Sequence, residues 1–326
     1  MKLLLLMVMM AASGLELTEA DKRAINEANE YVTRGNTFID KNSVARAKTE
    51  YQRALKVFPR HLDALYNLAV ACERLNQPDE AVATYKRYLE LKPDEADVWT
   101  QLGVRYDEKK LRDEAKAAYE KALSCDPDFG RAHHNLGVLL KEFGKMDEAQ
   151  KHLETFRQLE EKAGRHSGDA YYSLGVLYLE QGKLPEAKRL LQKALDEDPS
   201  IPRYNNAMGD IYAAGKELEA ALVCYKKAVD KDEKYAPAYS GMGDAHRELK
   251  QSDQAEKAYR KALQLRPDYY LVHFKLGLLR KETDPVAAIK DFEKYLASGK
   301  KLEFEKAAKE EIEKLKQPKQ DKQEKK

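Results

Sequence analysis

One spacing constrains this chain more than any other feature: small residues return every 34 positions along most of its length. A first column of small residues reads Gly35, Ala69, Gly103, Gly137, Gly175, Gly209, Gly243 and Gly277, with one interval of 38. A second column reads Ala47, Ala81, Ala115, Ala149, Ala187, Ala221, Ala255 and Ala288, with the same long interval and a last interval of 33. Two columns that stay in register through eight copies indicate a repeated structural unit.

Each copy predicts two helices. In the third copy, residues 96–129, the first apolar face consists of residues three or four apart: Trp99, Leu102, Gly103 and Tyr106. A second face follows the same spacing: Ala115, Ala118, Tyr119, Ala122 and Leu123. Pro127 then ends the second helix, because proline interrupts the helical hydrogen bonds. Two helices this short cannot bury their apolar faces alone, so we expect the copies to stack on one another.

This pattern resembles the tetratricopeptide repeat family, whose period is 34 residues. The matching positions are Trp99, Leu102, Gly103, Tyr106, Ala115, Tyr119, Ala122 and Pro127. The resemblance covers residues 28–302 as eight tandem repeats and implies an all-α fold. That fold is a right-handed superhelical solenoid of antiparallel helix pairs, and we expect a C-terminal capping helix to close it. Together with the N-terminal sequence, the resemblance is to a bacterial exported member of the family.

The interval of 38 divides the repeats into two predicted blocks. Repeats 1–4 span residues 28–162, an insertion covers residues 163–167, and repeats 5–8 span residues 168–302. Phe156 also replaces the small residue expected at the Ala122 position, which indicates a longer helix and altered packing there. The alternative is that the extra turn is absorbed without dividing the array.

Both ends of the chain depart from the repeat. Residues 1–14 combine one Lys with about ten apolar residues and then small ones, which fits a signal peptide too short to span a bilayer. Leu15 stands where a lipoprotein signal would have its acylated Cys, so we expect export to the periplasm or outside the cell without a lipid anchor. A cytoplasmic protein with an uncleaved apolar start is the alternative.

The segments next to the repeats also have predicted roles. Residues 15–27 form an N-terminal helical extension that begins at Thr18, with Asp21 completing the helix start. Residues 303–316 form the capping helix, whose apolar face consists of Phe304, Ala308, Ile312 and Leu315. Residues 317–326 contain no apolar side chain and are expected to be disordered.

Composition and motifs argue against nucleic-acid binding and against catalysis. Charged residues make up 35% of the chain but the net charge is only +2, so no basic surface for nucleic acid is indicated. The sequence contains no catalytic motif, and we expect no enzyme activity, cofactor or metal. His133 and His134 diverge by about 100° on a helix and do not easily share one metal ion. Cys72 is expected in the core, and the three cysteines have no disulfide or metal spacing.

In this family the first helix of each repeat lines the concave surface, so the columns beside Trp99 predict the binding groove. The Thr100 column reads Val32, Tyr66, Thr100, His134, Tyr172, Asn206, Ser240 and Phe274. The Gln101 column reads Thr33, Asn67, Gln101, Asn135, Ser173, Ala207, Gly241 and Lys275. The Val104 column reads Asn36, Val70, Val104, Val138, Val176, Asp210, Asp244 and Leu278.

These columns predict a peptide-binding groove. The valines and tyrosines form an apolar strip beside amides that can hold a peptide backbone, and Asp210 and Asp244 favour a positive charge further along. The alternatives are that the valines are packing between first helices and that the aspartates are merely solvated. The predicted ligand-binding residues are Asn36, Tyr66, Asn67, Val70, Gln101, Val104, His134, Asn135, Val138, Tyr172, Val176, Asp210 and Asp244.

Some members of the family bind the C-terminal carboxylate of chaperones through Lys, Asn and Arg side chains. Asn36 and Asn67 match the asparagines of that clamp, but Val32, Asp97 and Gln101 stand where its cations belong. We therefore expect no such clamp in repeats 1–3.

Two functions are consistent with these observations. The first is an interaction scaffold that binds a peptide or helical segment of a partner protein in its concave groove. The second is a structural subunit or assembly factor of a larger envelope complex, of the pilus or outer-membrane biogenesis type, which uses its ends or convex face or associates with itself. Neither function involves nucleic acid or a stable membrane span.

Overall fold

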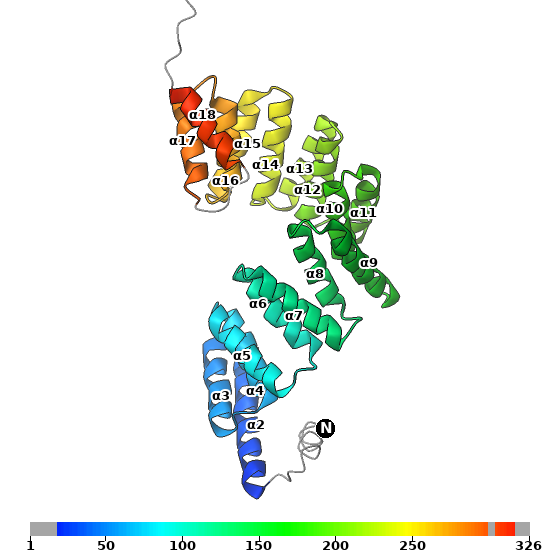
Figure 1. The fold of residues 1–326 in the computed structure, drawn as a ribbon, viewed down its shortest axis with the longest axis vertical. Coiled ribbons are helices and arrows are strands. Elements are labelled where there is room, and N and C mark those ends of the chain that lie inside the picture. Colours follow the sequence, from blue (N-terminus) through cyan, green and yellow to red (C-terminus); the bar gives the residue numbers. More distant parts are fainter. Residues whose placement is uncertain (1–17, 299–303, 317–326) are drawn as a thin grey trace, which may run out of the picture. The chain divides into compact units, whose positions relative to one another are not determined.

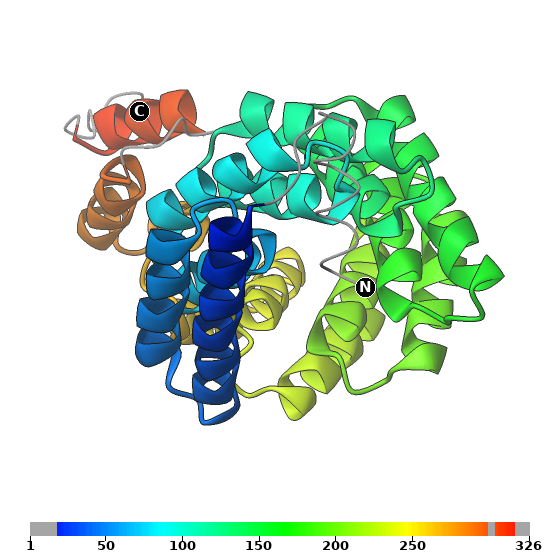
Figure 2. The same cartoon turned by 90° about the horizontal axis from the view of Figure 1, so that it is seen from below.

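The computed structural model describes residues 18–298 and 304–316, which form seventeen helices and no strand. The chain divides into two compact units between Leu159 and Glu160, called unit 1 and unit 2 below. Within each unit, consecutive helices pack side by side as antiparallel pairs, as α2 and α3 show in both views (Figure 1, Figure 2). The predicted all-α fold of stacked helix pairs is confirmed.

Unit 1 contains four helix pairs in chain order. They are α2 (Glu19–Asp40) with α3 (Val44–Val57), α4 (Leu62–Arg74) with α5 (Pro78–Leu91), α6 (Ala96–Glu108) with α7 (Arg112–Cys125), and α8 (Gly130–Glu142) with α9 (Met146–Lys162). The last three residues of α9 belong to unit 2.

Unit 2 contains four further pairs and a final helix. They are α10 (Gly168–Glu180) with α11 (Leu184–Glu197), α12 (Pro202–Ala214) with α13 (Leu218–Lys231), α14 (Ala236–Glu248) with α15 (Ser252–Leu265), and α16 (Tyr270–Arg280) with α17 (Pro285–Leu296), followed by α18 (Glu305–Lys316). In each pair of either unit we call the earlier helix the first helix and the later one the second helix.

The N-terminal helix begins where the sequence predicts. The Thr18 hydroxyl accepts a hydrogen bond from the Asp21 backbone N–H, and the Asp21 carboxylate accepts one from the Thr18 N–H. This reciprocal pair supplies partners to two groups that would otherwise be unsatisfied at the helix start. The helix then runs without interruption to Asp40, so the described part of the N-terminal extension and the first helix of repeat 1 are one element.

The four extra residues between repeats 4 and 5 lengthen α9 and its connection. Helix α9 has 17 residues, against 14 in α7 and α11, and α10 starts at Gly168. The division between the two units lies within α9. Phe156, the large residue in this helix, is buried against the ring of His134, with ring centroids 4.8 Å apart.

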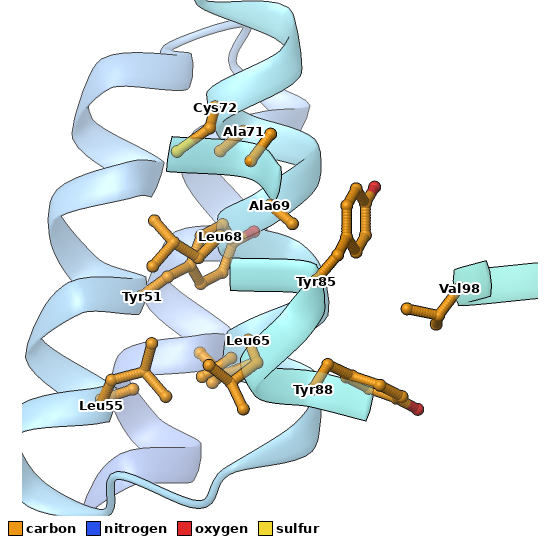
Figure 3. Close-up of a cluster of buried hydrophobic side chains, with 14 of the residues drawn as sticks. Tyr51, Leu55, Leu65, Leu68, Ala69, Ala71, Cys72, Tyr85, Tyr88 and Val98 are labelled. Carbon is orange, nitrogen blue, oxygen red and sulfur yellow. The ribbon is translucent and has the colours of Figure 1, made fainter. Parts of the chain in front are cut away.

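A small residue on each first helix accommodates a large side chain of the paired second helix. A Cβ atom added to Gly103 would lie 2.5 Å from Cε1 of Tyr119, closer than two such carbon atoms approach. Figure 3 shows the corresponding core of unit 1, where Tyr51 lies beside Leu65 and Leu68, and Tyr85 lies beside Ala69. Cys72 is completely buried, as predicted, and burial raises the pKa of its thiol to about 11. All three cysteines are free thiols.

The turn inside each of these pairs often uses the left-handed backbone region. Asn42, Asn76 and Lys110 have φ values of 53°, 55° and 63°, and Gly144 occupies the equivalent place with a φ of 73°. This conformation lets the chain reverse within three residues, so the two helices of a pair pack against each other immediately.

The last helix covers the final repeat. Ala308 and Ile312 of α18 are buried, and Phe304 stacks on Phe274 with ring centroids 4.9 Å apart and an interplanar angle of 5°. The other face of α18 carries Lys and Glu side chains, as a capping helix requires. The predicted signal peptide (1–14) and the predicted disordered tail (317–326) lie outside the described residues. None of the described helices has the length and apolar character needed to cross a membrane.

Replacing a pairing glycine should destabilise unit 2. A Cβ atom at Gly209 would lie 2.6 Å from Cε1 of Tyr225. We expect Gly209→Ala to lower the free energy of unfolding by about 1–3 kcal/mol, because a packed ring must move. Gly215→Ala, at the end of the same helix with no contact closer than 3.5 Å, is the control and should stay within about 0.5 kcal/mol of wild type. Urea unfolding midpoints measure both, and equal midpoints for the two variants would contradict this packing account.

Candidate functional site

The predicted groove residues lie on first helices of both units. Unit 1 carries Asn36 on α2, Tyr66, Asn67 and Val70 on α4, Gln101 and Val104 on α6, and His134, Asn135 and Val138 on α8. Unit 2 carries Tyr172 and Val176 on α10, Asp210 on α12 and Asp244 on α14. All of these side chains are half-buried except Asn36, which is exposed.

Half of the Thr100 column is buried, namely Val32, Thr100, Ser240 and Phe274. Thr100 and Ser240 are only 2% and 3% exposed, and the Thr100 hydroxyl donates a hydrogen bond to the Ala96 carbonyl at 2.8 Å. The buried members pack within the protein, whereas Tyr66, His134 and Tyr172 are half-buried and stay predicted ligand contacts.

Polar side chains bridge consecutive first helices in unit 1. Nδ2 of Asn67 on α4 donates to Oδ1 of Asn36 on α2 at 3.2 Å, and the Tyr66 hydroxyl donates to Oδ2 of Asp97 on α6 at 3.0 Å. Arg131 of α8 pairs with the same carboxylate. Burial, together with the nearby Asp97 carboxylate, raises the pKa of Tyr66 to about 12. These contacts place the first helices of unit 1 side by side with their Gln101-column residues on one surface.

Two amides on this surface keep their hydrogen-bonding groups free. Gln101 and Asn135 make no side-chain hydrogen bond to any residue within the described ranges, and both are half-buried. Val104 and Val138 lie one turn further along the same helices, so each amide neighbours an apolar side chain. The unit 1 face, as we call it, consists of Asn67, Val70, Gln101, Val104, Asn135 and Val138.

In unit 2 the aspartates have partners inside the protein. The Tyr225 hydroxyl donates to Oδ1 of Asp210 and the Tyr259 hydroxyl to Oδ1 of Asp244, each at 2.8 Å. Nζ of Lys275 also donates to Asp244. Both carboxylates therefore have partners within unit 2: Asp210 has Tyr225 and Asn206, and Asp244 has Tyr259 and Lys275.

The polar residues of the Val104 column are hydrogen-bond partners of tyrosines on the second helices. Asn36, Asp210 and Asp244 each accept a hydrogen bond from the tyrosine 15 positions later, and the same tyrosine packs against the glycine that precedes the acceptor. Where the side chain 15 positions later is tyrosine, a polar acceptor can be present: Tyr51 donates to Asn36 at 2.8 Å. Where it is Leu153 or Leu191, the residue of the column is Val138 or Val176. Val70 and Val104 also precede a tyrosine by 15 positions, so tyrosines on the second helix account for the polar residues of the column but not for its valines.

Asp210 is the most perturbed carboxyl of the first helices. Burial raises its pKa from 3.8 to about 6, although the Tyr225 hydrogen bond and the Lys275 charge act in the opposite direction. The Tyr225 ring itself is held between two glycines, since a Cβ atom at either Gly209 or Gly241 would lie 2.6 Å from its Cε1 atom. The carboxyl is thus fixed by a rigid donor in a poorly solvated position.

A cluster of aromatic and charged side chains at the start of unit 2 was not predicted, apart from Tyr172. The rings of Tyr172 and Tyr204 lie 5.4 Å apart, and the Arg203 guanidinium lies over both, 5.5 and 5.3 Å from their centroids. Arg203 and the Tyr204 hydroxyl both donate to the Asp169 carboxylate. Asp169 and Arg203 occupy the same repeat position as Asp97 and Arg131 in unit 1, so alternating charge at that position was the signal in the sequence.

A histidine pair in repeat 4, His133 with His152, was not predicted either. Nδ1 of His133 lies 2.9 Å from Nδ1 of His152, and Nε2 of His133 lies 2.8 Å from the Pro127 carbonyl oxygen. Since a carbonyl only accepts, Nε2 of His133 donates there, which leaves its Nδ1 to accept from His152. Burial lowers the pKa of His152, and the neighbouring His133 adds to this effect. No group of three or more potential metal ligands occurs in the described part of the chain.

Comparison with known proteins identifies the family. Models described as tetratricopeptide repeat match residues 32–96, 96–129, 128–196 and 236–269, and one described as TPR repeat matches residues 209–250. The chain belongs to the tetratricopeptide repeat family. A search of curated proteins found no match.

Solved structures show the same fold. The chain is similar to a tetratricopeptide repeat protein from Parabacteroides merdae, with 19% identity and a TM-score of 0.67 over 78% of this chain and 99% of that one. It is also similar to a chain in the crystal structure of the APC/C hetero-tetramer Cut9–Hcn1, with 19% identity and a TM-score of 0.65, covering 88% of this chain and 55% of that one. This chain thus spans little more than half the length of the latter. Family and fold together support a protein–protein interaction scaffold.

The burial of the Asp210 carboxyl predicts that the stability of the protein depends on pH, and that Asp210→Asn removes this dependence. Because the folded-state pKa of about 6 exceeds the unfolded value of 3.8, stability is fully present below pH 3.8 and declines as the pH rises through 6. We expect Asp210→Asn to keep the Tyr225 hydrogen bond, as Asn36 does with Tyr51, and to raise the free energy of unfolding at pH 7.5 by up to about 3 kcal/mol. Chemical denaturation at pH 4 and 7.5 measures this. Asp244→Asn, which leaves Lys275 unpaired, is the control and should not stabilise.

The histidine pair predicts a loss of stability in acid. Because the folded-state pKa of His152 lies below its ordinary value of 6.5, stability is full above pH 6.5 and falls as the pH drops through the folded-state pKa. His133→Tyr with His152→Leu reproduces Tyr171 and Leu190 of repeat 5 and should reduce the difference in unfolding midpoint between pH 7.5 and 5.5. An unchanged difference would show that the pair does not control this dependence.

Proposed function

We propose that the chain is an interaction scaffold that binds a peptide or helical segment of a partner protein on the unit 1 face. The observation that carries this proposal is the pair of open amides, Gln101 and Asn135, on adjacent first helices beside Val104 and Val138. A half-buried amide without a partner has lost part of its hydration and gains when another backbone supplies hydrogen bonds. Valine side chains next to it supply apolar contacts for the segment's own side chains.

Charge narrows the class of partner. The acidic Asp97 on this part of unit 1 is already paired with Arg131, and the six residues of the unit 1 face carry no charge. Burying an unpaired charge against such a surface would be costly, whereas a segment of apolar and neutral polar residues leaves no charge unsatisfied. We therefore infer a largely uncharged segment whose backbone groups meet the amides.

Unit 2 supports the proposal less directly. Its positions in the Gln101 column are Ser173, Ala207, Gly241 and Lys275, so it offers no amides there. Its aspartates accept hydrogen bonds from tyrosines of the same unit. Tyr172, Val176, Asp210 and Asp244 remain proposed ligand contacts, with a smaller share of the binding than the unit 1 residues.

We also propose that the protein acts in the periplasm or outside the cell. The support is the apolar run of residues 1–14 in the sequence. Retention of the protein in the cytoplasm at its full length would contradict this part of the proposal.

The binding proposal is tested with variants of the unit 1 face. Partners captured from native cells by crosslinking would be identified, and the contacting segment synthesised as a labelled peptide for fluorescence anisotropy. We expect Gln101→Ala with Asn135→Ala to weaken binding by roughly tenfold or more, since two hydrogen bonds of about 1 kcal/mol each are lost. Val104→Glu with Val138→Glu should abolish it while the helical circular dichroism spectrum stays unchanged.

A matched control separates the two candidate functions. Ala83→Glu with Ala117→Glu places the same charges on exposed positions of the second helices α5 and α7 and should leave peptide affinity unchanged. A partner that is kept by both unit 1 face variants and lost only with this control would favour the structural subunit or assembly factor. The same conclusion would follow if the protein occurred only in a stable complex of high mass.

A further inference from the structure

The last repeat of unit 2 contains a cavity that is separate from the predicted groove columns. It has a volume of about 730 Å³ and lies between the second helices α15 and α17, with the α16 residues Tyr270, His273, Leu276 and Arg280 along it. The groove-column residues of α16, Phe274, Lys275 and Leu278, do not line it. The volume is in the range of sites that hold small organic ligands or a few peptide side chains.

Three buried positions of this repeat carry ionisable side chains that other repeats largely lack. By repeat register, His273, Arg280 and Asp291 correspond to Trp99, Tyr106 and Ala118 of repeat 3. The side chains of His273, Arg280 and Asp291 are only 12%, 11% and 7% exposed. Repeat 7, which precedes them, has Tyr239, His246 and Ala258 at these positions. All three departures from the pattern meet at the cavity.

Stability alone does not explain this cluster. Nη1 of Arg280 donates to Oδ2 of Asp291 at 2.7 Å, and Nη2 donates to Oε1 of Glu256 at 2.6 Å. The attraction within a buried ion pair roughly offsets the cost of removing both charges from water, so apolar side chains would hold the repeat together equally well. Ionisable clusters beside a cavity are, by contrast, a recurring feature of binding sites.

Within the described part of the chain, one polar atom of the cluster lacks a partner, and one cation beside the cavity is unpaired. Nδ1 of His273 is buried without a hydrogen-bond partner among the described residues, and it lies 3.6 Å from Oδ1 of Asp291, beyond hydrogen-bond length. Lys294 lines the cavity and is exposed, and it forms no ion pair within the same residues. The charges of Arg260, Arg280 and Lys294 are opposed only by those of Asp291 and Glu256, which leaves one positive charge in excess.

We propose that this cavity binds a carboxylate carried on a short apolar stem. Lys294 supplies the unpaired positive charge, and His273 lines the cavity beside the carboxylate. Arg280 neutralises Asp291, which would otherwise repel the ligand, while Tyr270 and Leu276 contact the stem. Either a free short-chain organic acid or the C-terminal end of a partner protein has this chemistry. The proposal is independent of binding on the unit 1 face.

Titration of the full chain with paired probes tests the proposal and distinguishes the two sources. Butyrate should shift the His273 Cε1–H resonance in a saturable way, whereas butyramide, its uncharged analogue, should not. For so small a probe we expect a Kd of about 1 mM or weaker.

A tetrapeptide Ala-Ala-Ala-Leu with a free carboxylate that binds more tightly than butyrate, while its amide does not bind, would assign the site to a chain end. Equal or weaker binding of the peptide would assign it to a free acid. Absence of any saturable shift, or equal shifts with butyramide, would overturn the proposal.

Variants of exposed and buried residues complete the test. Lys294→Gln should weaken butyrate binding by about two- to fivefold, the usual effect of one partly solvated charge. Lys290→Gln, an exposed residue of the same helix outside the cavity, should leave it unchanged. His273→Tyr, Arg280→His and Asp291→Ala together copy repeat 7 and should give a folded protein without calorimetrically detectable butyrate binding. Undiminished binding in Lys294→Gln and in the triple variant would reject this cavity as the site.

Discussion

The close approach of a small residue on one helix to a large side chain on its partner sets the distance between the two helices of a pair. The ring of Tyr119 lies where a Cβ atom at Gly103 would be, and the same contact recurs between Gly209 and Tyr225 and between Gly277 and Phe292. It brings the two helices of a pair close enough to exclude water from the interface. In unit 2 the Tyr225 ring also contacts Gly241 of the following repeat, so a single side chain fixes both the pair and its neighbour.

This packing connects the core to the surface where ligands are expected. A tyrosine that fills the notch has a hydroxyl at its far end, and a buried hydroxyl requires a hydrogen-bond partner. Asn36, Asp210 and Asp244 supply that partner one residue after the small one. A polar residue on a first helix can therefore serve the core rather than a ligand. The distinction depends on whether its polar atoms already have partners: the Gln101 and Asn135 side chains have none among the described residues, whereas the Asp210 and Asp244 carboxylates do.

Much of the fold followed from the period, because a 34-residue repeat specifies each helix, its small notch and its stacking face. Helix α2 starts at Thr18, Cys72 is in the core, and α18 covers the last repeat, as expected from local patterns. The candidate site could be predicted from the sequence only in part. Whether the Thr100 column or the Gln101 column faces outward depends on the angle between neighbouring helix pairs, and no local sequence pattern encodes that angle. The pairing of His133 with His152 likewise joins two helices, and each residue alone resembles an ordinary member of its column.

Departures from the repeat are the most informative positions that remain. A stacked array needs only apolar and small residues at its contact columns, so an ionisable side chain there has a cost that its surroundings must offset. Repeat 4 offsets this cost with a hydrogen bond between His133 and His152, and the other ring nitrogen of His133 donates to the Pro127 carbonyl. Repeat 8 offsets it only in part, since Arg280 and Asp291 satisfy each other while the Nδ1 atom of His273 remains without a partner beside a cavity. A polar cluster whose groups all have partners is a structural substitution, whereas the unpartnered atom in repeat 8 supports the proposed carboxylate site in unit 2.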